Sequence, residues 1–150
     1  MISPSFQVQD ELYIHAASEA VWQKFSHLED WPRWNSEVIS AQWVHGDSWQ
    51  EGSIFNIHHK SLMGMKTTTP ALVQMCVPAN TVVWESNASG ITVVNSASFA
   101  DEVGGCKLTA RHAYHGLPTF ALRLLSGRQK RNLENAMREL KEFVEGTPRR

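Results

Sequence analysis

The sequence has little cysteine, no excess of charge of either sign and no long apolar run. Its two cysteines, Cys76 and Cys106, match no metal-binding or redox spacing, so we expect no metal site, no cofactor and no disulfide framework. The formal net charge is -1, which argues against nucleic acid as a partner. No apolar stretch approaches the roughly 18 residues of a membrane span, so we expect no integral membrane segment.

Two local features have ordinary interpretations. Arg128, Lys130 and Arg131 form a short basic cluster within a predicted helix, which we interpret as a solvated helix face. The first eleven residues are polar and include Asp10 and Glu11, unlike a secretory signal peptide. We therefore expect a soluble cytoplasmic protein, either a monomer or a homodimer.

Aromatic and apolar residues are plentiful enough for a packed core. The chain of 150 residues is 42% apolar and contains six Trp and six Phe, a composition that excludes intrinsic disorder. A chain of this length buries about 68–70% of the surface that its unfolded form exposes. We find no repeat or linker, and predict one domain over residues 1–150.

Strict alternation predicts the first strand over residues 6–14. Phe6, Val8, Leu12 and Ile14 occupy one side of it, and polar residues occupy most of the other. Asp10 falls on the apolar side, and we expect a bulge or an outward turn there. If its carboxyl group is instead buried, its pKa would rise and it could serve as a base.

Two short helices and six further strands are predicted next. Ser18 is a candidate N-cap for the first helix, and Asp30 for a second that ends at Trp34. Gly and Asn turns then separate runs rich in Val, Ile and Thr, which is typical of hairpins. Pro70 lies inside one run and favours an edge strand or a bulge there. The predicted strands are 38–45, 53–60, 65–77, 81–86, 91–99 and 106–115.

A long amphipathic helix over residues 119–145 completes the predicted order, since apolar residues recur there at close to 3.6-residue spacing. The expected fold is α+β: a seven-stranded antiparallel sheet that curves because strands twist, wrapped around this helix. A helix is about 10–12 Å wide, so it cannot fill the whole concave side. We therefore expect a cavity between the sheet and the helix.

An ordered set of short motifs resembles a known family across nearly the whole chain. The motifs are 18–22 (SEAVW), 28–35 (LEDWPRWN), 51–55 (EGSIF), Val83-Trp84, Gly90, 104–109 (GGCKLT) and Gly116. Together they resemble the START-related helix-grip superfamily, often called SRPBCC, and within it the polyketide cyclase/dehydrase and lipid-transport branch. The resemblance implies a helix-grip fold and hydrophobic ligands such as lipids, polyketides or isoprenoids. The family includes both enzymes and binding proteins.

The last two predicted strands supply the polar candidates. Alternation places His112 on the same face as Leu108 and Tyr114, where it could bind a ligand or act as an acid or base. Asn95 lies on the apolar face of the preceding strand and needs a partner. His58 and the adjacent His59 point to opposite faces of their strand, which argues against a shared metal ion.

The predicted ligand contacts come from several elements. We expect aromatic, Met and polar side chains to line the cavity, and the start of the long helix to cover its entrance, as the resemblance implies. The predicted set is Trp34, Phe55, Met65, Trp84, Asn95, Phe99, His112, Tyr114, Phe120 and Leu124.

Three functions are open at this point. The first is binding or transport of a hydrophobic or amphipathic small molecule, with His112 and Asn95 orienting its polar group. The alternative is an aromatase/cyclase-like or dehydratase-like enzyme that uses His112 with Asp10 or Asn95 as base and oxyanion donor. The third is a protein-binding module, for which the sequence offers little support.

Overall fold

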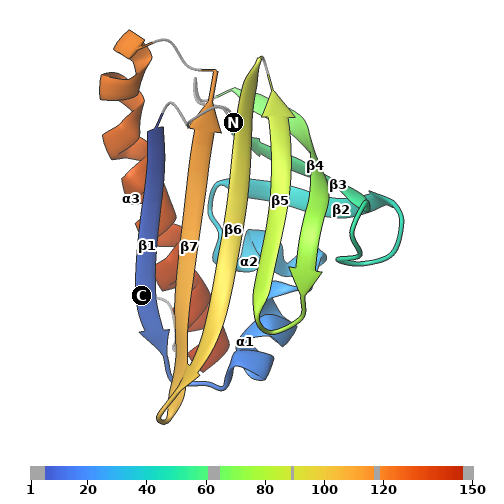
Figure 1. Cartoon of the computed structure of the whole chain (residues 1–150), viewed down its shortest axis with the longest axis vertical. Coiled ribbons are helices and arrows are strands. Elements are labelled where there is room, and N and C mark those ends of the chain that lie inside the picture. The colour runs from blue at the N-terminus through green and yellow to red at the C-terminus, as the bar shows by residue number, and fades with distance from the viewer. Residues whose placement is uncertain (1–5, 61–64, 89, 117–118, 147–150) are drawn as a thin grey trace.

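The fold is a curved antiparallel sheet that grips one long helix (Figure 1). The computed structural model describes residues 6–60, 65–88, 90–116 and 119–146, without the side chains of 88 and 119–126. The elements, in chain order, are β1 (Phe6–Ile14), α1 (Ser18–Phe25), the 3-10 turn η1 (Leu28–Asp30), α2 (Trp31–Trp34), β2 (Val38–His45), β3 (Ile54–Lys60), β4 (Lys66–Val77), β5 (Thr81–Ala88), β6 (Ile91–Glu102), β7 (Gly105–His115) and α3 (Thr119–Glu145).

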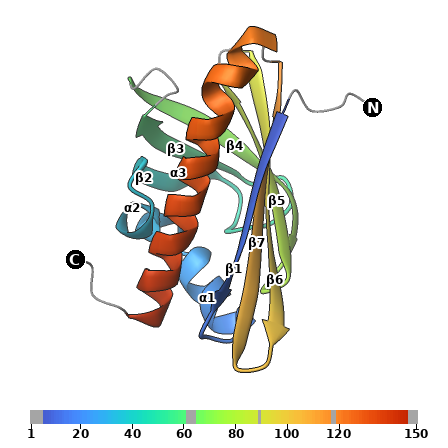
Figure 2. The ribbon, with the colours of Figure 1, turned by 90° about the vertical axis from the view of Figure 1, so that its left-hand side faces the viewer.

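The strands form one seven-stranded sheet in the order β1-β7-β6-β5-β4-β3-β2. Strands β2 to β7 follow one another as a meander, and β1 pairs with β7 across an unbroken register from Phe6–Tyr114 to Ile14–Cys106. Figure 2 shows α3 running along one face, with β1 on one side of it and β2 and β3 curling round on the other. The predicted helix-grip fold is confirmed.

Aromatic side chains fill one part of the space between the sheet and the short helices. Phe25, at the end of α1, makes ring contacts with six other aromatic residues at centroid distances of 5.6 to 6.0 Å. Two buried indoles donate hydrogen bonds to backbone carbonyls: Trp31 Nε1 to Phe25 at 2.8 Å and Trp49 Nε1 to Ser26 at 2.7 Å. The first bond joins α2 to α1, and the second joins the end of α1 to the loop before β3.

The first helix begins differently from the sequence prediction. Ser18 is its first helical residue rather than its N-cap, and Ala17 occupies the cap position without a side-chain bond. The carboxylate of Asp101 on β6 instead accepts a hydrogen bond from the Ser18 backbone N–H at 2.8 Å. This bond lowers the pKa of Asp101. Asp30 likewise makes no side-chain cap for α2.

Two predicted irregularities in strands are wrong. The β1–β7 register passes through Asp10 without a bulge or outward turn, because Asp10 pairs directly with Ala110. Strand β4 is an interior strand, and its bulge lies between Val73 and Met75 rather than at Pro70. Pro70 is tolerated because its pairing is with β3 alone, and the β4–β5 ladder begins one residue later.

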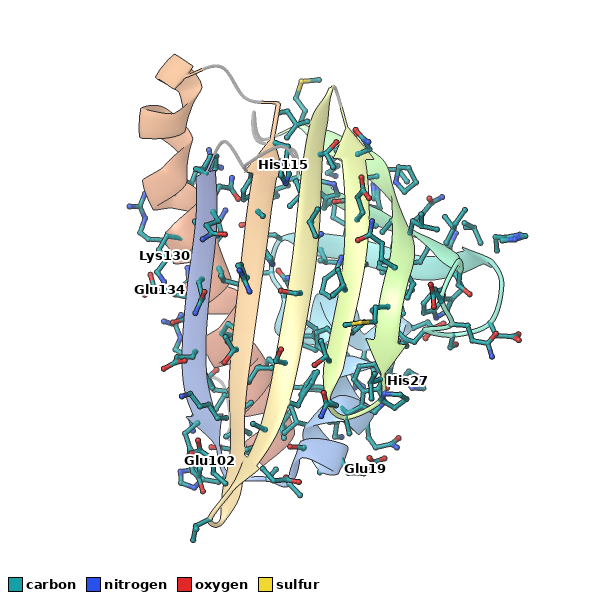
Figure 3. All side chains as sticks on the ribbon, in the orientation of Figure 1. Glu19, His27, Glu102, His115, Lys130 and Glu134 are labelled. Carbon is teal, nitrogen blue, oxygen red and sulfur yellow. The ribbon has the colours of Figure 1, made fainter. Side chains whose placement is uncertain are left out.

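Polar contacts attach α3 to the first strand. Lys141 Nζ donates to the Tyr13 carbonyl at 2.6 Å and to Glu145 Oε2 at 2.8 Å, and the His15 N–H donates to the same carboxylate oxygen at 2.8 Å. Lys130, labelled beside β1 in Figure 3, donates to the Gln9 carbonyl. The helix is thereby held at two places along β1. None of the helices among the described residues is long and apolar enough to cross a membrane.

Candidate functional site

A cavity of about 750 Å³ lies between the sheet and α3. Ligand pockets in proteins typically measure about 300–1,000 Å³, so this volume is suited to a small molecule. The greater part of the wall is apolar and is formed by residues such as Ile57, Val93, Leu108, Leu133 and Met137. The predicted space between sheet and helix is therefore present.

The structure brings six of the predicted ligand contacts together in the cavity wall. They are Trp34, Met65, Trp84, Asn95, His112 and Tyr114. They come from α2 and from strands and loops spread over β4 to β7, which the curvature of the sheet brings around one space. Their roles as ligand contacts remain predictions.

The other predicted residues lie elsewhere. Phe55 is fully buried against Trp31, Trp43 and Trp49, and Phe99 packs on Trp22 and Phe25. Both side chains are on the concave face, but at the part that the aromatic cluster fills. Asp10 is half-buried and is not part of the cavity wall. The side chains of Phe120 and Leu124 lie outside the described residues.

Asn95 and His112 form a polar cluster within the apolar wall. They are directly opposed on β6 and β7. The Asn95 amide donates to the carbonyls of Trp84 and Val93, each at 3.3 Å. Among the described residues, none donates to its side-chain oxygen, so that oxygen is available as an acceptor for a ligand.

Burial keeps His112 neutral. Removal from water lowers the pKa of His112 to about 4. The ring retains some accessible surface although protein surrounds it, because that surface borders the cavity. A neutral imidazole has one N–H donor and one acceptor nitrogen, so His112 and Asn95 together can bind a hydroxyl or a carbonyl group.

Tyr114 connects the cavity wall to the helix. Its hydroxyl donates to Gln129 Oε1 on α3 at 3.0 Å, and its ring stacks on Phe6 at a centroid distance of 4.5 Å. Burial raises the pKa of Tyr114 to about 12, so the phenol stays protonated. Because its proton is already donated to Gln129, this hydroxyl offers a ligand only an acceptor.

Trp34 contributes a donor without a partner. Its side chain is 5% exposed, and its Nε1 is buried with no hydrogen-bond partner among the described residues. A buried polar group without a partner costs about 1–3 kcal/mol. Trp34 belongs to the cavity wall, although its Nε1 itself has almost no accessible surface.

The sequence reasoning missed a second polar cluster, His59 and Thr69. Both residues belong to the cavity wall, and His59 Nε2 lies 2.7 Å from Thr69 Oγ1. Alternation places His59 on the same face as Phe55 and Ile57, and this signal was present in the sequence. The charged residues that contribute to the wall are Glu37, Lys60, Lys66 and Arg128.

A second hollow, of about 760 Å³, lies at the junction of α1, the loop before β3 and the β4–β5 turn. Most of its lining is exposed, with polar residues such as His27, Ser48 and Glu51. Its lack of an enclosed apolar wall makes it the poorer candidate for a hydrophobic ligand. Within the described part of the chain, no group of three or more His, Cys, Asp or Glu could hold a metal ion.

Residues 5–145 match the family described as "Polyketide cyclase / dehydrase and lipid transport". The chain belongs to this family. The predicted membership is thereby confirmed. No curated protein sequence matches the chain.

Solved structures of low sequence identity share the fold. TTHA0849 from Thermus thermophilus is 21% identical with a TM-score of 0.77, covering 96% of this chain and 100% of its own. A START superfamily protein from Mycobacterium smegmatis is 15% identical with a TM-score of 0.76, covering 95% and 99%.

A third similar structure is larger than this chain. The di-domain ARO/CYC StfQ from the steffimycin biosynthetic pathway is 17% identical with a TM-score of 0.76. The match covers 93% of this chain and 50% of that one, so this chain spans half of the di-domain protein. These likenesses concern the fold and leave the ligand of this family member open.

Proposed function

We propose that this protein binds a hydrophobic or amphipathic small molecule, of lipid, polyketide or isoprenoid type, in the cavity under α3. The observation that carries the proposal is the apolar cavity of about 750 Å³ with Asn95 and His112 in its wall. Burial of apolar ligand surface would supply about 25 cal/mol per Å² before the costs of association. The two polar side chains would orient one polar group of the ligand.

Binding or transport of this molecule is the activity that we propose. Three further statements remain predictions: the chain forms one domain, it lies in the cytoplasm, and it is a monomer or a homodimer. The description of the family, which includes lipid transport, supports a carrier role.

A fluorescent probe tests the cavity directly. Replacing Ala136 with tryptophan places a large ring on the side of α3 that borders the cavity. We expect this Ala136→Trp variant to bind N-phenyl-1-naphthylamine at least about tenfold more weakly, because the ring occupies the volume that the probe needs. Fluorescence titration measures the dissociation constant.

The neighbouring exposed residue supplies the control. Asn135→Trp adds the same ring one residue away on the outer side of α3, and should bind the probe as the wild type does. Thermal unfolding establishes that both variants fold. Equal probe affinity in the wild type and a folded Ala136→Trp variant would show that the probe binds elsewhere and would contradict the proposal.

An enzyme of the cyclase or dehydratase type is the second candidate. The feature that favours it is a neutral His112 beside Asn95, since a neutral imidazole can accept a proton and an amide can stabilise an oxyanion. Asp10, which is not part of the cavity wall, has no direct place in that chemistry. An unchanged turnover of a polyketide-type carbonyl substrate by His112→Ala would exclude this candidate.

A further inference from the structure

His59 and Thr69 form a hydrogen-bonded pair in the cavity wall. His59 Nδ1 lies 2.8 Å from the backbone carbonyl of Lys60, and Nε2 lies 2.7 Å from Thr69 Oγ1. A carbonyl oxygen can only accept, so Nδ1 must carry a proton. In the neutral ring Nε2 is then the acceptor, and the Thr69 hydroxyl donates its proton to it.

The bond to His59 determines whether the Thr69 hydroxyl can donate a hydrogen bond to a ligand or accept one from it. Because the hydroxyl proton is donated to His59, the lone pairs of Thr69 Oγ1 remain for a ligand. Thr69 is 5% exposed, and both residues border the cavity. The pair therefore offers an acceptor that suits a ligand hydroxyl.

This pair, which we name the β3–β4 cluster, lies far from Asn95 and His112, the β6–β7 cluster. One row of paired residues crosses the sheet from β4 to β7 and consists of Val73, Trp84, Asn95 and His112. Thr69 lies four residues from Val73 along β4. Rises of about 3.3 Å per residue and strand spacings of about 4.8 Å put Thr69 about 16 Å from Asn95 and about 20 Å from His112 along the sheet, and the curvature of the sheet shortens these distances through space.

The wall between the two clusters is mostly apolar, although Ser86 on β5 lies between Thr69 and Asn95. Ile57 and Trp84 contribute apolar surface from the sheet, and Leu133 and Met137 contribute it from α3. A ligand with one polar end would leave one of the clusters facing an apolar surface. The unused acceptor oxygen of that cluster, on Thr69 or on Asn95, would lose the chance of a hydrogen bond, so a ligand with polar groups at both ends fits this wall better.

We infer that the ligand is an elongated, mostly apolar molecule with a hydrogen-bonding oxygen at each end, one held by Asn95 and His112 and a hydroxyl held by Thr69 and His59. Allowing about 2.8 Å for a hydrogen bond at each end, its terminal oxygens are on the order of 10 Å apart. This inference rests on the proposed function and specifies its ligand class. It favours a molecule oxygenated at both ends over a simple fatty acid.

Three rigid probes of the same shape test the inference. They are biphenyl, 4-phenylphenol and 4,4′-biphenol, which carry zero, one and two terminal hydroxyl groups. Displacement of N-phenyl-1-naphthylamine gives their dissociation constants for the wild type and for Thr69→Val, which removes the hydroxyl at nearly constant volume. We expect affinity for the wild type to rise with each hydroxyl group.

The variant should affect only the doubly hydroxylated probe strongly. We expect Thr69→Val to lower the affinity for 4,4′-biphenol by about three- to tenfold, as for one lost hydrogen bond. The variant should then bind 4,4′-biphenol and 4-phenylphenol with similar affinity. The dissociation constant for biphenyl should differ by no more than about twofold between the variant and the wild type, because biphenyl makes no hydrogen bond. An unchanged affinity for 4,4′-biphenol, or an equal loss for biphenyl, would overturn the inference while leaving the proposed function in place.

A measurement on the wild type keeps the test independent of the variant's folding. Nitrogen-15 spectra of the His59 ring should show a protonated Nδ1, and the Nε2 resonance should shift when 4,4′-biphenol is added but not when biphenyl is added. The absence of that shift would also overturn the inference. If none of the three probes binds the wild type, the proposed function fails together with it.

Discussion

Replacing Phe25 with alanine will lower the free energy of unfolding by about 3–5 kcal/mol. Phe25 is 5% exposed and contacts the rings of six aromatic residues that come from α1, α2, the loop before β3, β5 and β6. Its removal deletes a buried ring, and its neighbours cannot close the space because hydrogen bonds fix the Trp31 and Trp49 indoles. Denaturant titration followed by Trp fluorescence measures the change.

The same substitution at Phe143 is the control. The ring of Phe143 is half-buried near the end of α3, with Lys24 Nζ 5.2 Å and Arg33 Cζ 5.9 Å from its centroid. We expect Phe143→Ala to cost about 1 kcal/mol, the central value for point substitutions. If Phe25→Ala costs no more than Phe143→Ala, the aromatic cluster does not anchor the short helices as described.

Acidification will destabilise the protein through His112. The pKa of His112 is about 4 in the folded state, against about 6.5 when unfolded. The unfolded state therefore binds the extra proton first, and stability falls as the pH drops from about 6.5 to about 4. Above that window both states are neutral at this residue and it has no effect. Between pH 7 and pH 4.5 the loss attributable to His112 is about 2–3 kcal/mol.

The difference between variants isolates this contribution. Denaturant titrations at pH 7 and pH 4.5 should show a smaller acid-induced loss for His112→Gln than for the wild type. His45→Gln, which changes an exposed histidine, should behave as the wild type does. Equal losses in His112→Gln and the wild type would mean that His112 takes up its proton in the folded state without penalty, contrary to burial in an apolar wall.

Periodicity predicted most of the fold because successive side chains of a strand alternate between the two faces of the sheet, and these faces differ in burial. The alternation in residues 6–14 and the 3.6-residue spacing in 119–145 correspond to β1 and α3 with unchanged bounds. The cavity followed from geometry, since one helix is narrower than a seven-stranded curved sheet. The family resemblance supplied the same arrangement independently.

Periodicity could not predict position along the concave face. Phe55 and Phe99 have the alternation of cavity residues, but they lie where α1 and α2 supply aromatic rings to cover them. The Asp101 bond to Ser18 and the Thr69 bond to His59 depend on which residues meet across space. A single sequence predicts which face of the sheet a side chain lies on, but it does not predict which residues from other elements contact that side chain.

The pairing of β1 with β7 has a consequence for synthesis on the ribosome. Phe6 can pair with Tyr114 only after the six other strands have been synthesised. The hydrogen bond from Lys141 to the Tyr13 carbonyl can form only later still. Strand β1 therefore emerges well before its pairing partner β7, and its hydrogen-bonding edge stays unpaired until β7 has been made. Rapid completion of the chain, or a chaperone that covers this strand, would protect the nascent protein from aggregation.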